Sequence, residues 1–311
     1  MTITFYAAIC LGLVIFVIGC VRRTLQYARM PIHLRWEVYP VPHEEQSRVA
    51  HGGSYFEESD WWTKPRHSSL VGELRVMIPE ILFLKGLWEF NRRLWLPSFL
   101  FHFGLYLLIG TAVLVAIGGG LPLLVPSIAS GSLWIALAAL YKITGYAGAI
   151  LSVLGALLLL LRRATSQELK NYTKPADFFN LIFFIVAFAA VAVGYVLRPT
   201  GSAGIGDVAR GLFHFDTNVA VDWLFGTGLV LASALVAYIP FTHMAHFIAK
   251  YFTYHFVRWD DQPNVRGSSI EARVAQYLTY RPTWSAAHVG ADGKRTWVDI
   301  ATTNPAQEVR K

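Results

Sequence analysis

The chain has 311 residues, of which 54% are hydrophobic, and its formal net charge is +7. Its mean hydropathy is +0.42, and several long stretches carry almost no charge, which excludes an ordinary soluble domain. The basic residues gather in alternate connections between these stretches. That distribution indicates membrane topology rather than nucleic-acid binding.

Five apolar segments predict an all-α integral membrane protein with five transmembrane helices. Each segment can cross about 30 Å of hydrocarbon at roughly 1.5 Å per residue. Continuous apolar runs, rather than alternating ones, favour helices over a closed barrel. We expect the spans near 2–21, 96–118, 131–161, 177–197 and 223–249. The third is so long that it must tilt or extend beyond the lipid.

The connections between these spans predict their orientation. Residues 22–95, 162–176 and 250–311 together carry 24 Lys and Arg, whereas 119–130 and 198–222 carry 2. The positive-inside rule therefore places the N-terminus outside and the C-terminus in the cytoplasm.

The chain is accordingly divided into four parts. We expect a first transmembrane anchor (1–21), a cytoplasmic arm (22–95), a four-helix transmembrane core (96–249) and a cytoplasmic tail (250–311). From Leu70 to Trp95 the arm has apolar residues at spacings of three and four, which predicts an amphipathic helix. Such a helix can lie on the inner leaflet, dock a soluble partner, or do both.

Two histidines lie in apolar segments where an ionisable side chain is costly. His102 lies in LPSFLFHFGLYLLIG and His246 in LVAYIPFTHMAHFIAK. With the expected topology both fall toward the cytoplasmic side, so they can meet at similar depth. A facing pair of imidazoles predicts a b-type haem with two histidine axial ligands, which makes both residues metal ligands. The alternative is two interfacial histidines with ordinary hydrogen bonds.

Other residues near this pair are candidates for the haem surroundings. His243 can replace His246 as the ligand or donate to a haem propionate, and Pro240 can bend the helix and adjust the ligand direction. Arg92 and Arg93, at the mouth of the second span, can donate to propionates or serve only as positive-inside anchors. Gly104 and Ala245 keep side-chain bulk low beside His102 and His246.

Several strings resemble known cytochromes. SFLFHFGLYLLIG and IPFTHMAHFIAK, with five spans, resemble the gamma subunit of respiratory nitrate reductases. LRWEVYPVPHE, GGSYFEESDWWTKPR, PEILFLKGLWEFNRRLW and ADGKRTWVDIATTNP resemble the arm and tail of the DsrM and Tmc-type membrane cytochrome b subunits of sulfate-reducer redox complexes.

The resemblance implies functional residues. His102 and His246 match the ligands of the haem b nearer the cytoplasm. The positions of the ligands of a second, outer haem are Ala112 and Gly228, which cannot bind iron, so one haem is expected. His214 can supply one outer ligand by another route, but no outer partner for it is evident in the sequence.

The resemblance also implies a quinone site at Lys142, in ALAALYKITGYAGAIL. Its ammonium can donate to a quinone carbonyl, with Tyr141 and Tyr146 as helpers, or it can extend to the outer interface instead. His214 and Asp222 are further candidates, as acceptors of quinol protons.

These patterns predict a cytochrome b membrane subunit of a quinone-linked oxidoreductase. It would pass electrons between menaquinone or another quinone and a cytoplasmic iron–sulfur partner through haem b. Cys10 and Cys20 have no nearby cysteine partner, so the chain ligates no iron–sulfur cluster by itself. This electron-transfer subunit is therefore expected to be incomplete alone. The resemblance implies a heterodisulfide-reductase-like iron–sulfur subunit, and further redox subunits are possible. The alternative is a haem-free membrane anchor for a peripheral redox enzyme.

Overall fold

The computed structural model describes residues 1–30, 42, 44, 58–65, 67–127, 131–260, 262–284 and 289–303. Within these residues every regular element is helical, which confirms the predicted all-α class. Most of the first half of the arm (22–95), with all but Pro42 and Glu44 of the string LRWEVYPVPHE, lies outside the described residues. The chain forms two compact units, Met1–Arg23 with Leu74–His246, and Thr24–Glu73 with Phe247–Lys311.

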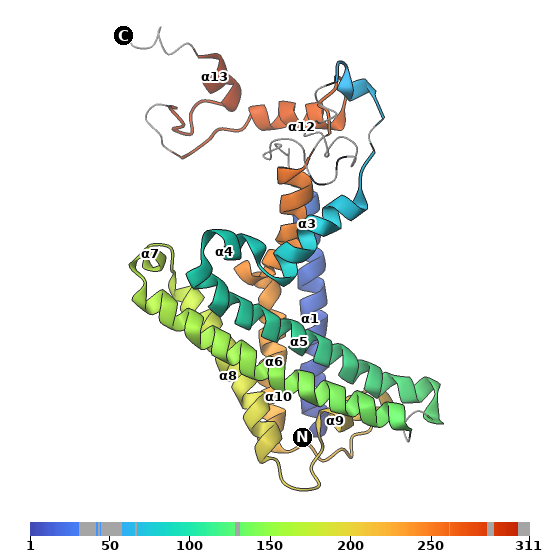
Figure 1. Cartoon of the computed structure of the whole chain (residues 1–311). Coiled ribbons are helices and arrows are strands. Elements are labelled where there is room, and N and C mark those ends of the chain that lie inside the picture. The colour runs from blue at the N-terminus through green and yellow to red at the C-terminus, as the bar shows by residue number, and fades with distance from the viewer. Residues whose placement is uncertain are drawn as a thin grey trace. The chain divides into compact units, whose positions relative to one another are not determined.

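Five helices within the described residues are long and apolar enough to cross a membrane, as predicted (Figure 1). They are α1 (Thr2–Ala28), α5 (Arg92–Leu124), α6 (Ser132–Thr165), α8 (Pro175–Leu197) and the segment Trp223–Phe241, most of which is α10 (Trp223–Tyr238). The first four extend beyond the predicted limits at one end or both. Helical hydrogen bonding does not depend on lipid, so polar turns at the ends, such as the one with Arg22 and Arg23, remain helical.

The fifth span is not the continuous helix to residue 249 that the sequence predicts. α10 ends at Tyr238, and two 3-10 turns, Ile239–Phe241 and His243–Ala245, precede α11 (His246–Phe252). Pro240 has no N–H and its ring clashes with the preceding helical turn, while Thr242 between the two turns is extended. The bend expected at Pro240 is thus a break, and His246 begins a new helix.

The amphipathic segment before α5 also divides in two. α3 (Leu70–Leu82) and α4 (Lys85–Phe90) are separated at Leu84, whose φ is 53°. The left-handed conformation of a leucine is unfavourable and ends a regular helix. A single helix over this segment was therefore a wrong expectation.

Shorter helices lie between the spans and in the second unit. α7 (Gln167–Lys170) and α9 (Ile205–His214) belong to the unit that holds the long helices. The second unit contains a π-helix (Thr253–Arg258), α12 (Ser269–Leu278) and α13 (Trp297–Thr302).

Small residues bring α5 and α6 together along their length (Figure 1). A Cβ on Gly155 would lie 2.3 Å from the backbone nitrogen of Phe101, and one on Gly104 would lie 2.4 Å from that of Ser152. Close backbone approach at small residues is a common way for membrane helices to associate. Gly104 therefore accommodates α6, which is a different role from clearing space beside His102.

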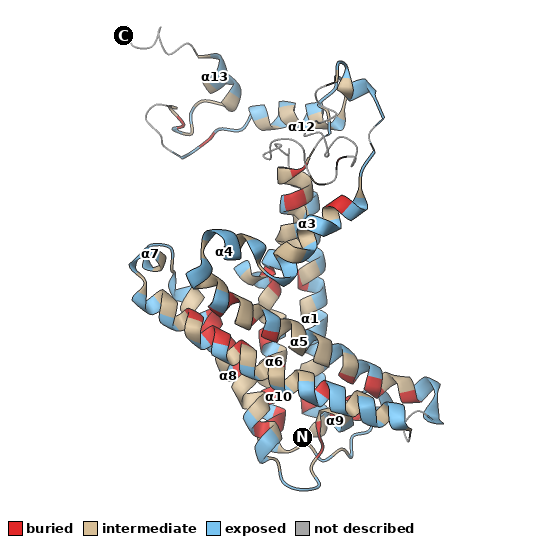
Figure 2. Ribbon diagram, in the orientation of Figure 1, coloured by how far each residue is buried: buried red, intermediate tan, exposed pale blue. Residues whose placement is uncertain are grey.

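The buried side chains of this unit fall where its helices face one another (Figure 2). One core cluster joins α5, α6, α8 and α10 through Phe101, Ala156, Leu159, Leu181, Phe184, Ala187 and Leu235. Two glycines let α1 pack closely on the fifth span. A Cβ on Gly12 would lie 2.7 Å from the Ser233 carbonyl oxygen of α10, and one on Gly19 would lie 2.7 Å from Pro240 Cβ in the 3-10 turn that follows α10.

Candidate functional site

His102 is held by α5 in a fixed ring orientation. Its Nδ1 lies 2.7 Å from the carbonyl oxygen of Ser98, one turn earlier in the helix. A bond of this kind requires Nδ1 to carry the proton and leaves Nε2 as the nitrogen with a lone pair. The preceding residue, Phe101, packs edge-on against Phe184 in the core, so the backbone at His102 is anchored by buried aromatic contact.

His246 has the same arrangement at the start of α11. Its Nδ1 lies 3.3 Å from the carbonyl oxygen of His243. The imidazoles of His102 and His246 face each other with their ring centroids 6.0 Å apart and their planes at 67°. The structure thus brings together two residues that are 144 positions apart in the chain.

The geometry of this pair fits axial ligation of one iron. A first-row metal lies about 2 Å from an imidazole nitrogen and roughly 3 Å from the ring centroid, so two ligands on opposite sides have centroids about 6 Å apart. Both Nδ1 atoms point to backbone carbonyls, which is how metal-binding histidines are usually oriented. Within the described residues no group of three or more His, Cys, Asp or Glu could hold a metal ion. A haem needs only the two imidazoles that are present.

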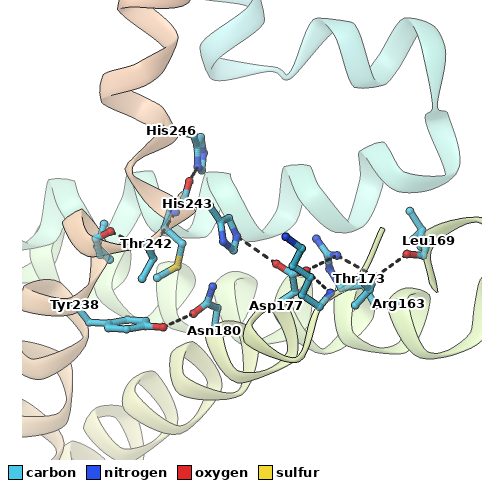
Figure 3. A network of polar contacts seen from close by, with 12 residues as sticks. Arg163, Leu169, Thr173, Asp177, Asn180, Tyr238, Thr242, His243 and His246 are labelled. Carbon is cyan, nitrogen blue, oxygen red and sulfur yellow. Dashed lines mark hydrogen bonds and ion pairs between the residues drawn. The ribbon is translucent and has the colours of Figure 1, made fainter. Parts of the chain in front are cut away.

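His243 is directed toward Asp177 of α8 (Figure 3). Its Nε2 lies 3.5 Å from Oδ1 of Asp177, whose side chain is 16% exposed. The other carboxylate oxygen accepts the backbone N–H of Lys174 at 2.8 Å and lies 3.7 Å from Arg163 Nη1. Of the two candidates for the second ligand, His246 is the one that faces His102.

The residues around Asp177 form a polar network that the sequence did not single out. Arg163 also donates to Thr173, and one turn further along α8 the Tyr238 hydroxyl donates to Oδ1 of Asn180 at 3.0 Å (Figure 3). The only sequence signal was an Asp in the first turn of a helix that begins with proline. That signal is typical of an ordinary N-terminal cap.

The two arginines expected near the haem edge are both exposed at the start of α5. The guanidinium of Arg92 lies over the Trp88 ring, 4.5 Å from its centroid, and its Nε donates to the Trp88 carbonyl. Arg93 is exposed as well. Their role toward propionates stays a prediction.

Lys142 and Tyr146 are one helical turn apart on α6, and both are exposed. The Tyr146 ring lies 5.9 Å from that of Tyr195 on α8. Within the described part of the chain Lys142 has neither an ion pair nor a hydrogen bond. Tyr141, in contrast, is buried, and its hydroxyl lies against Gly206 of α9.

The structure separates the residues that were expected to accept quinol protons or to bind an outer haem. Asp222 caps α10, because its carboxylate accepts the backbone N–H groups of Leu224 and Phe225. His214 instead lines a cavity of about 440 Å³ on one face of α9, with Asp207 and Arg210. A Cβ at Gly228 would lie 2.7 Å from the backbone nitrogen of Val191, so that face of α10 is closed by α8.

The fold defines a multi-pass helical membrane protein in which the imidazole of His102, in the second span, faces that of His246, just after the fifth span. Residues 87–261, more than half of the chain, match the model of the nitrate reductase gamma subunit. The chain therefore belongs to the nitrate reductase gamma subunit family, whose members are membrane cytochrome b subunits of quinone-linked complexes. No curated protein matched the sequence. The family confirms an electron-transfer role in an oxidoreductase, while closeness to the sulfate-reducer group stays a prediction.

Proposed function

We propose that this chain is the cytochrome b subunit of a quinone-linked oxidoreductase in the cytoplasmic membrane of a bacterium or archaeon. It passes electrons between a membrane quinone, such as menaquinone, and a cytoplasmic iron–sulfur partner. His102 and His246 are the axial ligands of one haem b. Bound haem b supplies reversible one-electron chemistry, and the protein sets its ligands and surroundings.

The observation that carries this proposal is the His102–His246 pair. The ring centroids are 6.0 Å apart, and each Nδ1 is directed to a backbone carbonyl one turn away. Interfacial histidines with only ordinary hydrogen bonds have no reason to face each other from two different helices. Membership of a cytochrome b family supports the same interpretation.

For the quinone we propose a contact on the outer half of α6. The Lys142 ammonium donates to a quinone carbonyl, and Tyr146, beside Tyr195, lies on the same side of the helix. A lysine that faces lipid, with no ion-pair partner among the residues the structure describes, is costly, and a polar ligand would lower that cost.

For the partner we propose docking on the arm and the tail. α4 exposes the large apolar side chains of Trp88 and Phe90, of which Phe90 is 88% exposed. The tail adds exposed aromatic residues such as Trp284. The chain itself has two cysteines, in α1, so iron–sulfur clusters belong to the partner, for which a heterodisulfide-reductase-like subunit is our candidate.

Haem content of the purified full chain tests this function directly. The wild-type protein should give a b-type pyridine haemochrome spectrum. His102→Ala and His246→Ala should each lose it, because one remaining imidazole cannot hold the iron in a six-coordinate low-spin state.

His243→Ala is the matched control. It removes a histidine three residues from His246 but keeps the main-chain carbonyl that orients the His246 ring. The control should retain the spectrum. A wild-type chain without a b-type band would favour the haem-free anchor, and loss of the band in His243→Ala alone would reassign the second ligand.

A further inference from the structure

The break between α10 and α11 leaves backbone groups that a continuous helix would pair. In an α-helix the Pro240 carbonyl would accept the N–H of Met244. Here the Met244 N–H goes instead to Oγ1 of Thr242, at 3.1 Å. The Pro240 carbonyl thus loses its helical partner at a place where the chain leaves the membrane-spanning part of the bundle, and such a group needs another donor.

That donor comes from the first helix. Nε of Arg23, on α1, lies 2.9 Å from the Pro240 carbonyl oxygen and donates to it, across 217 positions of sequence. One turn earlier, Gly19 lets the backbone of α1 touch the Pro240 ring, since a Cβ there would lie 2.7 Å from Pro240 Cβ. A guanidinium bond to a carbonyl is charge-assisted and stronger than a neutral one.

The opposite side of the break is held by α8. The Tyr238 hydroxyl donates to Asn180, and His243 lies 3.5 Å from Asp177. The broken segment is therefore fixed between α1 and α8. Its last residues supply both the His246 ring and the His243 carbonyl that orients this ring.

We propose that Arg23 is a positioning residue for the second axial ligand. Through the Pro240 carbonyl it fixes the break, and the break sets the direction from which His246 approaches His102. This inference rests on the proposed function, because it assigns to α1 the control of a haem ligand. It also gives the first span a role beyond anchoring.

Arg23→Ala in the full chain tests the inference, with Arg22→Ala as the matched control. Arg22 is the neighbouring, exposed arginine. Its substitution removes one positive charge beside the first span, as Arg23→Ala does, but leaves the hydrogen bond to the Pro240 carbonyl in place. Arg23→Ala should still bind haem b but show a shifted or broadened low-spin electron paramagnetic resonance signal, which reports on the relative orientation of axial imidazoles. Arg22→Ala should match the wild type.

A second measurement does not depend on haem. Amide hydrogen exchange in peptides covering 239–250 should be faster in Arg23→Ala than in Arg22→Ala, because a freed carbonyl loosens the segment. Gly19→Ala should disturb the same peptides and the same signal without changing any charge. Arg23→Lys keeps a cationic donor and should restore both readouts at least in part.

Two results would distinguish a failure of this inference from a failure of the proposed function. If the wild type binds haem b and Arg23→Ala equals Arg22→Ala in both the resonance signal and the exchange rates, Arg23 does not position the ligand. If the wild type binds no haem b, the proposed function fails, and the ligand-positioning role fails with it.

Discussion

Gly155→Ala is expected to weaken the close packing between α5 and α6 that supports His102. The added methyl would lie 2.3 Å from the nitrogen and 2.7 Å from the Cα of Phe101. Both are backbone atoms, so no side-chain rotation relieves the clash. Ordinary contacts are about 3.5–4 Å, so α6 must withdraw by roughly 1 Å or more.

The magnitude follows from two opposing effects. Overpacking of a tight contact costs about 1–3 kcal/mol. Replacing a helical glycine by alanine returns up to about 1 kcal/mol through higher helix propensity. With the full 1 kcal/mol returned, the net expectation is a loss of roughly 0–2 kcal/mol in the free energy of unfolding. Because Phe101 adjoins His102, part of the displacement should reach the imidazole pair and reduce haem retention on heating.

The assay compares thermal unfolding and haem retention of the purified variants in detergent. Gly110→Ala is the matched control, since Gly110 also lies in α5 and a Cβ there meets nothing within 4 Å among the described residues. The control should equal or exceed the wild type in stability. If Gly155→Ala were as stable as Gly110→Ala, the two backbones would not approach as closely as the structure places them.

Two further predictions concern the quinone contact and the tail. Lys142→Ala should slow quinol-driven reduction of the haem in stopped-flow measurements and leave the haem spectrum intact, whereas unchanged kinetics would make Lys142 an interfacial lysine. In the tail, hydrogen bonds from the side chain and backbone of Thr296 lower the pKa of Asp299 below its ordinary value near 3.8. Because the pKa of Asp299 is lower in the folded than in the unfolded protein, its ionised carboxylate stabilises α13 at pH values above the unfolded pKa. This stabilisation is lost as the pH falls through the folded pKa. Thr296→Ala should raise the pKa of Asp299 in a carboxyl titration followed by nuclear magnetic resonance, and an unchanged pKa would contradict this cause.

The transmembrane helices were predictable because each is encoded by local composition. Continuous apolar residues report burial in lipid without reference to any other segment. The ends were less predictable, since Arg22 and Arg23 read as the inner limit of the first span yet lie within α1. The division of the amphipathic segment at Leu84 had no signal, because leucine is not typical of a left-handed position.

The candidate site was predictable to the extent that its residues are chemically unusual. A histidine inside an apolar run is conspicuous, and the pairing of His102 with His246 followed from their matched depth. Arg23, Asp177 and Asn180 were not conspicuous. A basic residue after a span and an acid in a first helical turn are ordinary features. Their roles depend on contacts between segments far apart in the chain, such as Arg23 with Pro240.

The two ends of the proposed electron path are far enough apart to be tested separately. Gly155 lies against Phe101 and Gly104 against Ser152, so His102 on α5 is level with residue 154 of α6. Lys142 is twelve residues from that level, which is about 18 Å along the helix. The hydroxyls of Thr111 and Thr144, 2.8 Å apart, keep the same register between the two helices nearer to Lys142.

This separation makes the proposed roles independent of each other. Substitutions more than about 10 Å apart usually have additive effects. Lys142→Ala should therefore change the rate with quinol without altering the low-spin signal, and Arg23→Ala should alter that signal in the same way whether or not Lys142 is present. If the two substitutions were strongly coupled, the quinone would have to bind close to the imidazole pair, and the contact proposed on the outer half of α6 would be misplaced.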